Sequence, residues 1–285
     1  APGSTLWLER TWDVGHIPLF AIWMATLLLR LPQPPALSAI VIRALLLASI
    51  AVSIEFIQRR TGRSFSTLDI YLDVCGIAVG VRLAWPALRA LRAGRRHVLD
   101  LVLVALIAYG LKDAGMYLFD RVYMSGQFPQ LWSADQPLPQ LRFAGSAKTR
   151  MVADKDATSK RLLEVTYDQQ DYSSLDMVVI SEDWRGYSSL NIRVMNPAAK
   201  LSRIICRIHD LAHYANGGNF NDRFNREFLL DPGWNTLTVA LEDIEKAPVQ
   251  REMQMNHIGN LNCFTQHLAA PERVYFREIW LDKKP

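Results

Sequence analysis

Four long apolar segments near the start of the chain constrain its fold more than any other feature. They lie at residues 14–31, 36–57, 69–88 and 97–115. About 20 helical residues, at about 1.5 Å of rise each, cross the hydrocarbon core of a bilayer. The connections, such as PQPP at 32–35 and RAGRR at 92–96, are short and polar, which indicates turns. We therefore expect an α-helical polytopic membrane domain of about four helices over residues 1–126. A soluble helical bundle is the alternative.

The distribution of charge supports this division of the chain. Residues 1–126 contain 13 Lys and Arg against 8 Asp and Glu, whereas residues 127–285 contain 19 against 20. Arginines that flank apolar segments are typical of membrane proteins. The sequence contains no basic stripe with interleaved aromatic residues, so we expect a lipid bilayer as partner and no nucleic acid. Because the chain begins at Ala1 without a methionine, we also expect that a segment precedes it.

The second half has the pattern of an all-β domain. Residues 127–139 are rich in proline and are predicted to be a linker. Residues 140–285 contain short runs rich in β-branched and aromatic residues, several with alternating apolar and polar positions, separated by turn residues. Eight or nine strands without an intervening helical pattern predict an antiparallel β-sandwich or jelly roll. The expected fold class is therefore multidomain, with a helical membrane domain followed by a sandwich.

Polar residues recur at helical spacing inside the apolar segments. Glu55 and Gln58 are three apart, and Asp69 and Asp73 are four apart, so each pair shares one helix face. Gly76 and Gly80 continue the face of Asp69 and Asp73, which predicts a stripe of small and polar residues that lets another helix approach closely. Charged groups within membrane segments usually face the bundle interior or water. The predicted membrane polar site comprises His16, Glu55, Gln58, Arg63, Asp69 and Asp73. It is either a network that locks the helices together or a binding or catalytic site. No nucleophile motif or metal-ligand spacing identifies a reaction, so the catalytic residues are unknown.

One motif in this region carries a family resemblance. A Glu-x-x-Gln pair, a Gly-Arg turn, and then one Asp and two Gly residues follow one another at Glu55, Gln58, Gly62, Arg63, Asp69, Gly76 and Gly80. Over roughly residues 10–90 the chain resembles the VanZ-like family of bacterial membrane proteins. DVGH at 13–16 is similar to the family's Asp-Lys-x-x-His entry to the preceding helix. Two positions depart from the family pattern: Asp73 stands where asparagine is usual, and Val14 where lysine is usual. The resemblance implies an integral membrane protein of the cell envelope, in a family associated with glycopeptide antibiotic resistance.

The second half carries a separate resemblance. The stretches GYSSLNIRVMNP, GWNTLTVALEDI and VYFREIWLD are similar to strands of the galactose-binding-like β-sandwiches, a group that includes many carbohydrate-binding modules. The resemblance implies a galactose-binding-like β-sandwich at 140–285 and a glycan or cell-wall polymer as ligand. Fold alone does not settle the ligand.

Sugar binding requires an aromatic face and planar polar groups, and the loop at 209–226 is the richest local source of both. The predicted ligand-binding residues are Trp184, Tyr187, Asp210, His213, Tyr214, Asn219, Asn221, Asp222 and Arg223. Trp184 is either a stacking platform or a core residue. Asp222 and Arg223 could instead form an ion pair that braces the loop. Trp234 lies in a strand pattern, and we expect it in the core.

No cofactor is expected, although two features bear on metals and redox state. Asp210 and Asp222 could contribute to a structural calcium site, but no calcium-loop pattern surrounds them. His209 and His213 straddle a strand end, which does not favour zinc. Cys206 and Cys263 both fall in predicted strands, where they form a disulfide if the domain lies outside the cytoplasm, or remain buried thiols.

Three functional hypotheses follow. The first is a multi-pass membrane protein that presents an extracytoplasmic carbohydrate-binding sandwich; the basic stretch at 89–96 favours that orientation. The second is a membrane enzyme or transporter-like protein that acts on a lipid-linked or cell-wall precursor. The third is an envelope scaffold whose sandwich binds another protein.

Overall fold

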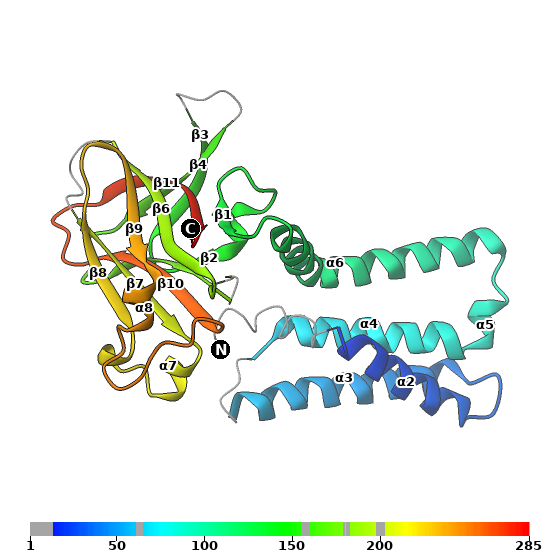
Figure 1. Ribbon diagram of the computed structural model, residues 1–285. Helices are drawn as coiled ribbons and strands as arrows, with labels where there is room; N and C mark the ends of the chain where they lie inside the picture. The colour runs from blue at the N-terminus through cyan, green and yellow to red at the C-terminus, as the bar shows by residue number, and fades with distance from the viewer. Residues whose placement is uncertain are drawn as a thin grey trace. The chain divides into compact units, whose positions relative to one another are not determined.

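The computed structural model describes residues 14–60, 65–154, 160–178, 180, 183–197 and 203–284 (Figure 1). Within this part of the chain two compact units are present, one ending at Met116 and one beginning at Tyr117. The first is helical and the second is built of strands. Arg63, one of the residues predicted for the membrane polar site, lies outside the described residues.

The helical unit contains a helix at each of the four expected apolar segments. The helices are α2 (His16–Leu29), α3 (Leu37–Arg60), α4 (Thr67–Ala84), the short α5 (Pro86–Arg89) and α6 (Ala93–Ser125). Ser66 caps α4, since its side chain accepts a hydrogen bond from the Asp69 N–H. α4 stops before Pro86, which has no N–H to continue the helix. At 33 residues α6 is longer than the apolar segment that predicted it, because its polar C-terminal part is also helical.

Two glycines allow α2 and α4 to pack closely, as Figure 1 shows. A Cβ placed on Gly76 would lie 2.5 Å from the Ile17 carbonyl oxygen, and one on Gly80 would lie 2.6 Å from that of Ala21. Neither position has room for a side chain. The prediction that this stripe of small residues admits a neighbouring helix is confirmed, and α2 is that neighbour.

By length and composition, α3 is the one helix of the described residues that could cross a membrane. Only 17% of its most apolar 18-residue stretch is buried, whereas a core helix of a soluble protein is mostly buried. α2 is apolar but shorter. α4 carries Asp69, Asp73 and Arg82, which lower its apolarity. The prediction of four membrane spans therefore stays a prediction.

The second unit is the expected antiparallel arrangement of two sheets. Eleven strands lie in the described residues: β1 (Gln130–Ser133), β2 (Phe143–Ala144), β3 (Lys148–Ala153), β4 (Arg161–Tyr167), β5 (Ser173–Met177), β6 (Tyr187–Asn196), β7 (Arg203–Asp210), β8 (Phe224–Leu229), β9 (Gly233–Ala240), β10 (Ile258–Thr265) and β11 (Glu272–Lys283). One sheet has six strands in the order β3-β4-β11-β6-β9, with β1 paired to β11. The other has five strands in the order β2-β5-β10-β7-β8.

The segment predicted to be a linker, 127–139, belongs to the sandwich. β1 pairs with β11, and both Leu131 and Trp132 are completely buried. The Trp132 indole N–H donates to the Pro139 carbonyl at 2.9 Å. Asp120, in the last turns of α6, forms a buried ion pair of 2.7 Å with Arg142, so this end of α6 also belongs to the second unit. Proline content misled the prediction, because prolines are tolerated next to an edge strand.

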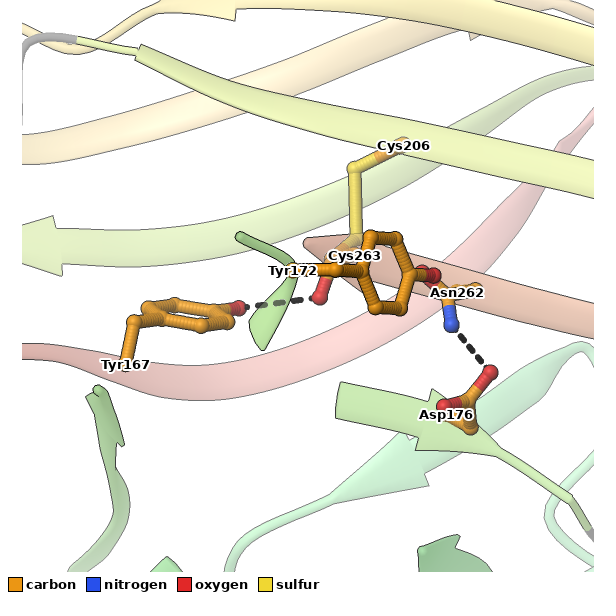
Figure 2. Close-up of a disulfide and its surroundings, with 6 residues drawn as sticks. All are labelled: Tyr167, Tyr172, Asp176, Cys206, Asn262 and Cys263. Carbon is orange, nitrogen blue, oxygen red and sulfur yellow. Dashed lines mark hydrogen bonds between the residues drawn. A yellow bond between two sulfur atoms is a disulfide. The ribbon is translucent and has the colours of Figure 1, made fainter. Parts of the chain in front are cut away.

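The core of the second unit contains alternate residues of both sheets, together with a cross-strand disulfide (Figure 2). Cys206 of β7 and Cys263 of β10 are paired in register, with their Cα atoms 4.3 Å apart, and form the disulfide. Of the two possibilities that the sequence left open, the structure has the bonded one. The hydroxyl of Tyr167, from β4 in the other sheet, donates to the Cys263 carbonyl at 3.1 Å and so joins the two sheets.

Candidate functional site on the five-stranded sheet

The outer face of the five-stranded sheet carries a row of polar side chains from four adjacent strands. Ile204, Cys206 and Ile208 of β7 point into the core, so the alternating residues Ile205 and Arg207 point outward. The strand register places one outward-pointing residue of each of the four strands beside that of the neighbouring strand. The row consists of Asp176 of β5, Asn262 of β10, Arg207 of β7 and Asn225 of β8.

Hydrogen bonds hold the centre of this row in a fixed arrangement. The Asn262 side chain is completely buried and donates to Asp176 (Figure 2). Its amide oxygen accepts from the Tyr172 hydroxyl at 3.2 Å. Asp176 also accepts from the Ser174 hydroxyl at 2.9 Å. Carboxylate, amide and phenol groups are therefore positioned before any ligand arrives, which limits the entropy lost on binding.

Aromatic rings lie beside the polar row. The rings of Tyr172 and Phe264 are 4.8 Å apart, and 36% of Tyr172 is exposed. Phe220 is 64% exposed, and the guanidinium of Arg223 lies 4.9 Å from its ring centre. These side chains and Arg207 line a hollow of about 410 Å³, a volume typical of small-molecule sites. The face thus combines exposed aromatic rings with planar polar groups.

His209 extends the polar face at the end of β7. Its side chain is 2% exposed, and its ring centre lies 4.8 Å from that of Tyr214 and 4.5 Å from that of His213. Burial lowers the pKa of His209 to about 4, and the neighbouring charges of His213 and Arg207 act in the same direction. The imidazole is consequently neutral at pH 7.

Arg251 organises the loop that the sequence singled out. Its guanidinium bonds the Asp210 carboxylate, with Nη2 to Oδ1 at 2.7 Å, and the Asp222 carboxylate, with Nε to Oδ1 at 2.6 Å. Burial opposes ionisation of Asp210, but the hydrogen bonds from Arg251 and from the Gln254 N–H outweigh it and lower the pKa of Asp210. The hydrogen bond from Arg251 likewise lowers the pKa of Asp222.

The two carboxylates that bond Arg251 are those predicted for a calcium site. Asp210 and Asp222 share one guanidinium, which supplies the positive charge that a metal ion would bring. No group of three or more His, Cys, Asp or Glu side chains within the described residues is arranged to hold a metal ion. The alternative in which Asp222 braces the loop through an ion pair is correct in kind, but its partner is Arg251 rather than Arg223.

Three of the predicted ligand-binding residues are buried and stabilise the fold instead. Trp184 is completely buried in the core of the sandwich, so its role as a stacking platform is excluded. Asp210 is also completely buried, where it forms an ion pair with Arg251. His213 is 4% exposed, and its Nδ1 is 3.0 Å from the Asp222 carbonyl oxygen. The positions of Asp210 and His213 follow from the loop folding back over the end of β7 (α7, Ala212–Ala215).

The remaining predicted ligand residues are accessible, but they do not form one site. Tyr214 is 48% exposed beside His209, and Arg223 lines the hollow on the sheet face. Asn219 and Asn221 line a different hollow of about 390 Å³ with Asp222 and Arg251. The Asn219 side chain caps the short helix η3 (Phe220–Asp222) by accepting from the Asn221 N–H. Tyr187 packs edge-on against Phe128, with ring centres 5.2 Å apart.

Sequence reasoning missed the residues at the centre of the face: Tyr172, Asp176, Arg207 and Asn262. Alternation in RIICRIHD does indicate that Arg207 lies on the face opposite Cys206. It does not indicate which strands flank β7, and only that neighbourhood brings Asn262 and Asp176 beside Arg207.

The membrane polar site predicted in the helical unit is partly assembled. Nδ1 of His16 lies 2.8 Å from Oδ1 of Asp73, and Nε2 lies 3.9 Å from Oδ2 of Asp69. Glu55 is 1% exposed and accepts from the Ser66 N–H at 2.8 Å, at the N-terminus of α4. Gln58, one turn further along α3, is partly buried. These contacts connect α2 and α3 to α4, in agreement with a network that locks the helices together.

Comparison with known proteins gives only distant similarities. No family model and no curated protein matches the sequence, so the VanZ-like resemblance depends on its residue pattern alone. Among solved structures, a family 11 carbohydrate-binding module from Clostridium thermocellum, in complex with a β-1,3-1,4-mixed-linked tetrasaccharide, is 12% identical with a TM-score of 0.39. It covers 50% of this chain and 89% of its own length.

Two further structures resemble the chain to a similar degree. A family 30 carbohydrate-binding module of a Clostridium thermocellum cellulase is 12% identical with a TM-score of 0.36, and covers 49% of this chain and 91% of its own. An exo-beta-agarase is 12% identical with a TM-score of 0.44, and covers 55% of this chain and 25% of its own. At these identities and TM-scores, a shared function does not follow.

Proposed function

We propose that the protein binds glycans on the outer face of the five-stranded sheet. The observation that carries this proposal is the group of partly exposed Asp176, Arg207 and Asn225, which the buried Asn262 helps to position. The exposed rings of Tyr172 and Phe220 lie beside it. Sugar hydroxyls pair with carboxylate, amide and guanidinium groups, and the apolar face of a pyranose packs on aromatic rings. The ligand is a cell-wall or extracellular polysaccharide.

The helical unit serves as a membrane anchor in this proposal. α3 has the length and apolarity of a membrane span, and exposed apolar side chains on α2 and α6 provide further surface for lipid. The Cys206–Cys263 disulfide supports an oxidising compartment for the sandwich, since such bonds persist outside the cytoplasm. The protein is then a multi-pass membrane protein with an extracytoplasmic glycan-binding domain.

The test is binding of the detergent-solubilised chain to an array of bacterial cell-wall and plant-wall oligosaccharides. We expect Tyr172→Ala to weaken binding about tenfold, the effect of losing one stacking ring. Trp234→Ala is the matched control, because Trp234 is 40% exposed on the outer face of the other sheet. Equal losses in both variants, or binding by neither variant nor parent, would contradict the proposal. Capture of a protein instead of a glycan by the same face would favour the scaffold hypothesis.

A further inference from the structure

The hollow on the five-stranded sheet contains two arginines that form no hydrogen bond with a carboxylate of the described residues. Arg207 and Arg223 both line it, and each has an Nε atom that is shielded from solvent and has no hydrogen-bond partner among the described residues. Both side chains are partly buried. An N–H donor that has lost water without gaining a partner is costly. Such donors indicate a missing acceptor.

The carboxylates nearby are engaged elsewhere. Asp176 accepts from Asn262 and Ser174, and its Oδ1 is 3.8 Å from Nη2 of Arg207, beyond hydrogen-bond distance. Glu227 also lines the hollow, but its closest cation is Arg203, at 3.6 Å. The guanidinium of Arg223 lies over the ring of Phe220 and forms no ion pair with a carboxylate in the described part of the chain.

The two arginines are also close enough to repel one another. Burial lowers the pKa of Arg223, and the charge of Arg207 lowers it further. Arg226, at the edge of the hollow, adds a third positive charge, with Asp243 at 3.7 Å from its guanidinium. His209 is neutral at pH 7 and does not change this balance. An anion between Arg207 and Arg223 would accept hydrogen bonds from their guanidinium groups and offset the repulsion.

We propose that this site selects acidic glycans, with a carboxylate or sulfate of the sugar held between Arg207 and Arg223 while a neighbouring ring packs against Phe220 or Tyr172. The inference rests on the proposed glycan-binding function and narrows it to a substrate class. Guanidinium groups pair with carboxylates and sulfates through two parallel hydrogen bonds, which a neutral hydroxymethyl group cannot reproduce.

The experiment uses the full chain in detergent and a panel of uronic-acid tetrasaccharides. Each is supplied in its anionic form and in a carboxyl-reduced form, in which every carboxylate has become a hydroxymethyl group. We expect at least one anionic form to bind about tenfold or more tightly than its reduced partner. Raising the salt concentration should reduce that preference.

Two variants locate the effect. Arg223→Gln should abolish the preference for the anionic form, because it removes one of the two charges that hold the anion. Arg193→Gln is the control, because Arg193 is an exposed arginine of the opposite sheet that lies 5.2 Å from the Trp234 ring. It should leave the preference unchanged.

The outcomes separate this inference from the function on which it depends. Equal binding of anionic and reduced forms, or a preference that survives Arg223→Gln, overturns the acidic-glycan inference but leaves glycan binding in place. Binding of neither form by any member of the panel overturns the inference. If the neutral oligosaccharide array is also negative, the proposed function fails as well.

Discussion

At the scale of residues, exposure in the fold decides between the two alternatives for Trp184 and reverses the expectation for Trp234. Trp184 was a candidate sugar platform but is completely buried, whereas Trp234 was expected in the core but is 40% exposed. Both tryptophans lie next to turn residues and strand patterns, so their local sequences do not distinguish a buried ring from an exposed one. The difference arises because Trp184 packs in the core between the sheets, while Trp234 alternates with Leu237 and Val239 and points outward.

His209 gives the sandwich a dependence on pH. Its pKa is about 4 in the folded protein and about 6.5 when unfolded. Between these values the unfolded chain binds more protons, so stability must fall as the pH is lowered from about 6.5 to about 4. We expect the midpoint of urea unfolding, followed by tryptophan fluorescence, to decrease across this window. The decrease should be smaller in His209→Gln.

The control for this measurement is His267→Gln, because the His267 side chain is 74% exposed. This variant should keep the full decrease. The depressed pKa values of Asp210 and Asp222 contribute in a different range, since stability from those carboxylates is lost only as the pH falls below their usual values. An unfolding midpoint that is constant from pH 6.5 to 4 in the parent protein would contradict the neutral, buried state of His209.

At the scale of elements, β7 and β10 determine both faces of the five-stranded sheet. Their inward residues include Cys206 and Cys263, and their outward residues include Arg207 and Asn262. Because side chains alternate along a strand, the disulfide on one face fixes the register of the polar row on the other. A one-residue slip would move Arg207 into the core and Cys206 to the surface.

Loss of the disulfide should therefore affect both stability and binding. The bond closes a loop between cysteines 57 residues apart, for which chain entropy predicts about 4 kcal/mol. We expect Cys206→Ala combined with Cys263→Ala to lower the free energy of unfolding by about this amount. Cys75→Ala, at the buried free cysteine of α4, is the matched control and should not change the unfolding of the sandwich. Mass spectrometry that finds two alkylatable thiols in the native protein, in addition to Cys75, would refute the bond.

At the scale of the whole molecule, two units of different surface chemistry share one chain. The helical unit exposes large apolar residues such as Leu45 and Leu101, whereas the sandwich buries most of its own in one core. Water penalises the first kind of surface, and a bilayer does not. Under the proposed function, lipid surrounds the helices and water surrounds the strands, which explains this difference.

This explanation predicts that the chain stays in the membrane pellet after alkaline extraction. Leu45→Lys places a charge in the middle of α3, at an apparent insertion cost of about 3 kcal/mol, and should move a large part of the protein to the supernatant or to degradation. Leu229→Lys is the control, because Leu229 is also an exposed leucine but lies on β8 of the sandwich. Recovery of the parent chain as a monomer in buffer without detergent would rule out the membrane anchor.

The sequence by itself determined the features that depend on neighbours along the chain. Apolar length and turn residues located all four long helices, the spacing of Gly76 and Gly80 predicted a close helix contact, and alternation predicted an antiparallel sandwich. Only the tertiary structure decided which distant residues meet. Arg251 joins Asp210 from 41 positions away, and Asp176 meets Asn262 from 86 positions away. Strand order and loop folding set these contacts, and local periodicity contains no information about either.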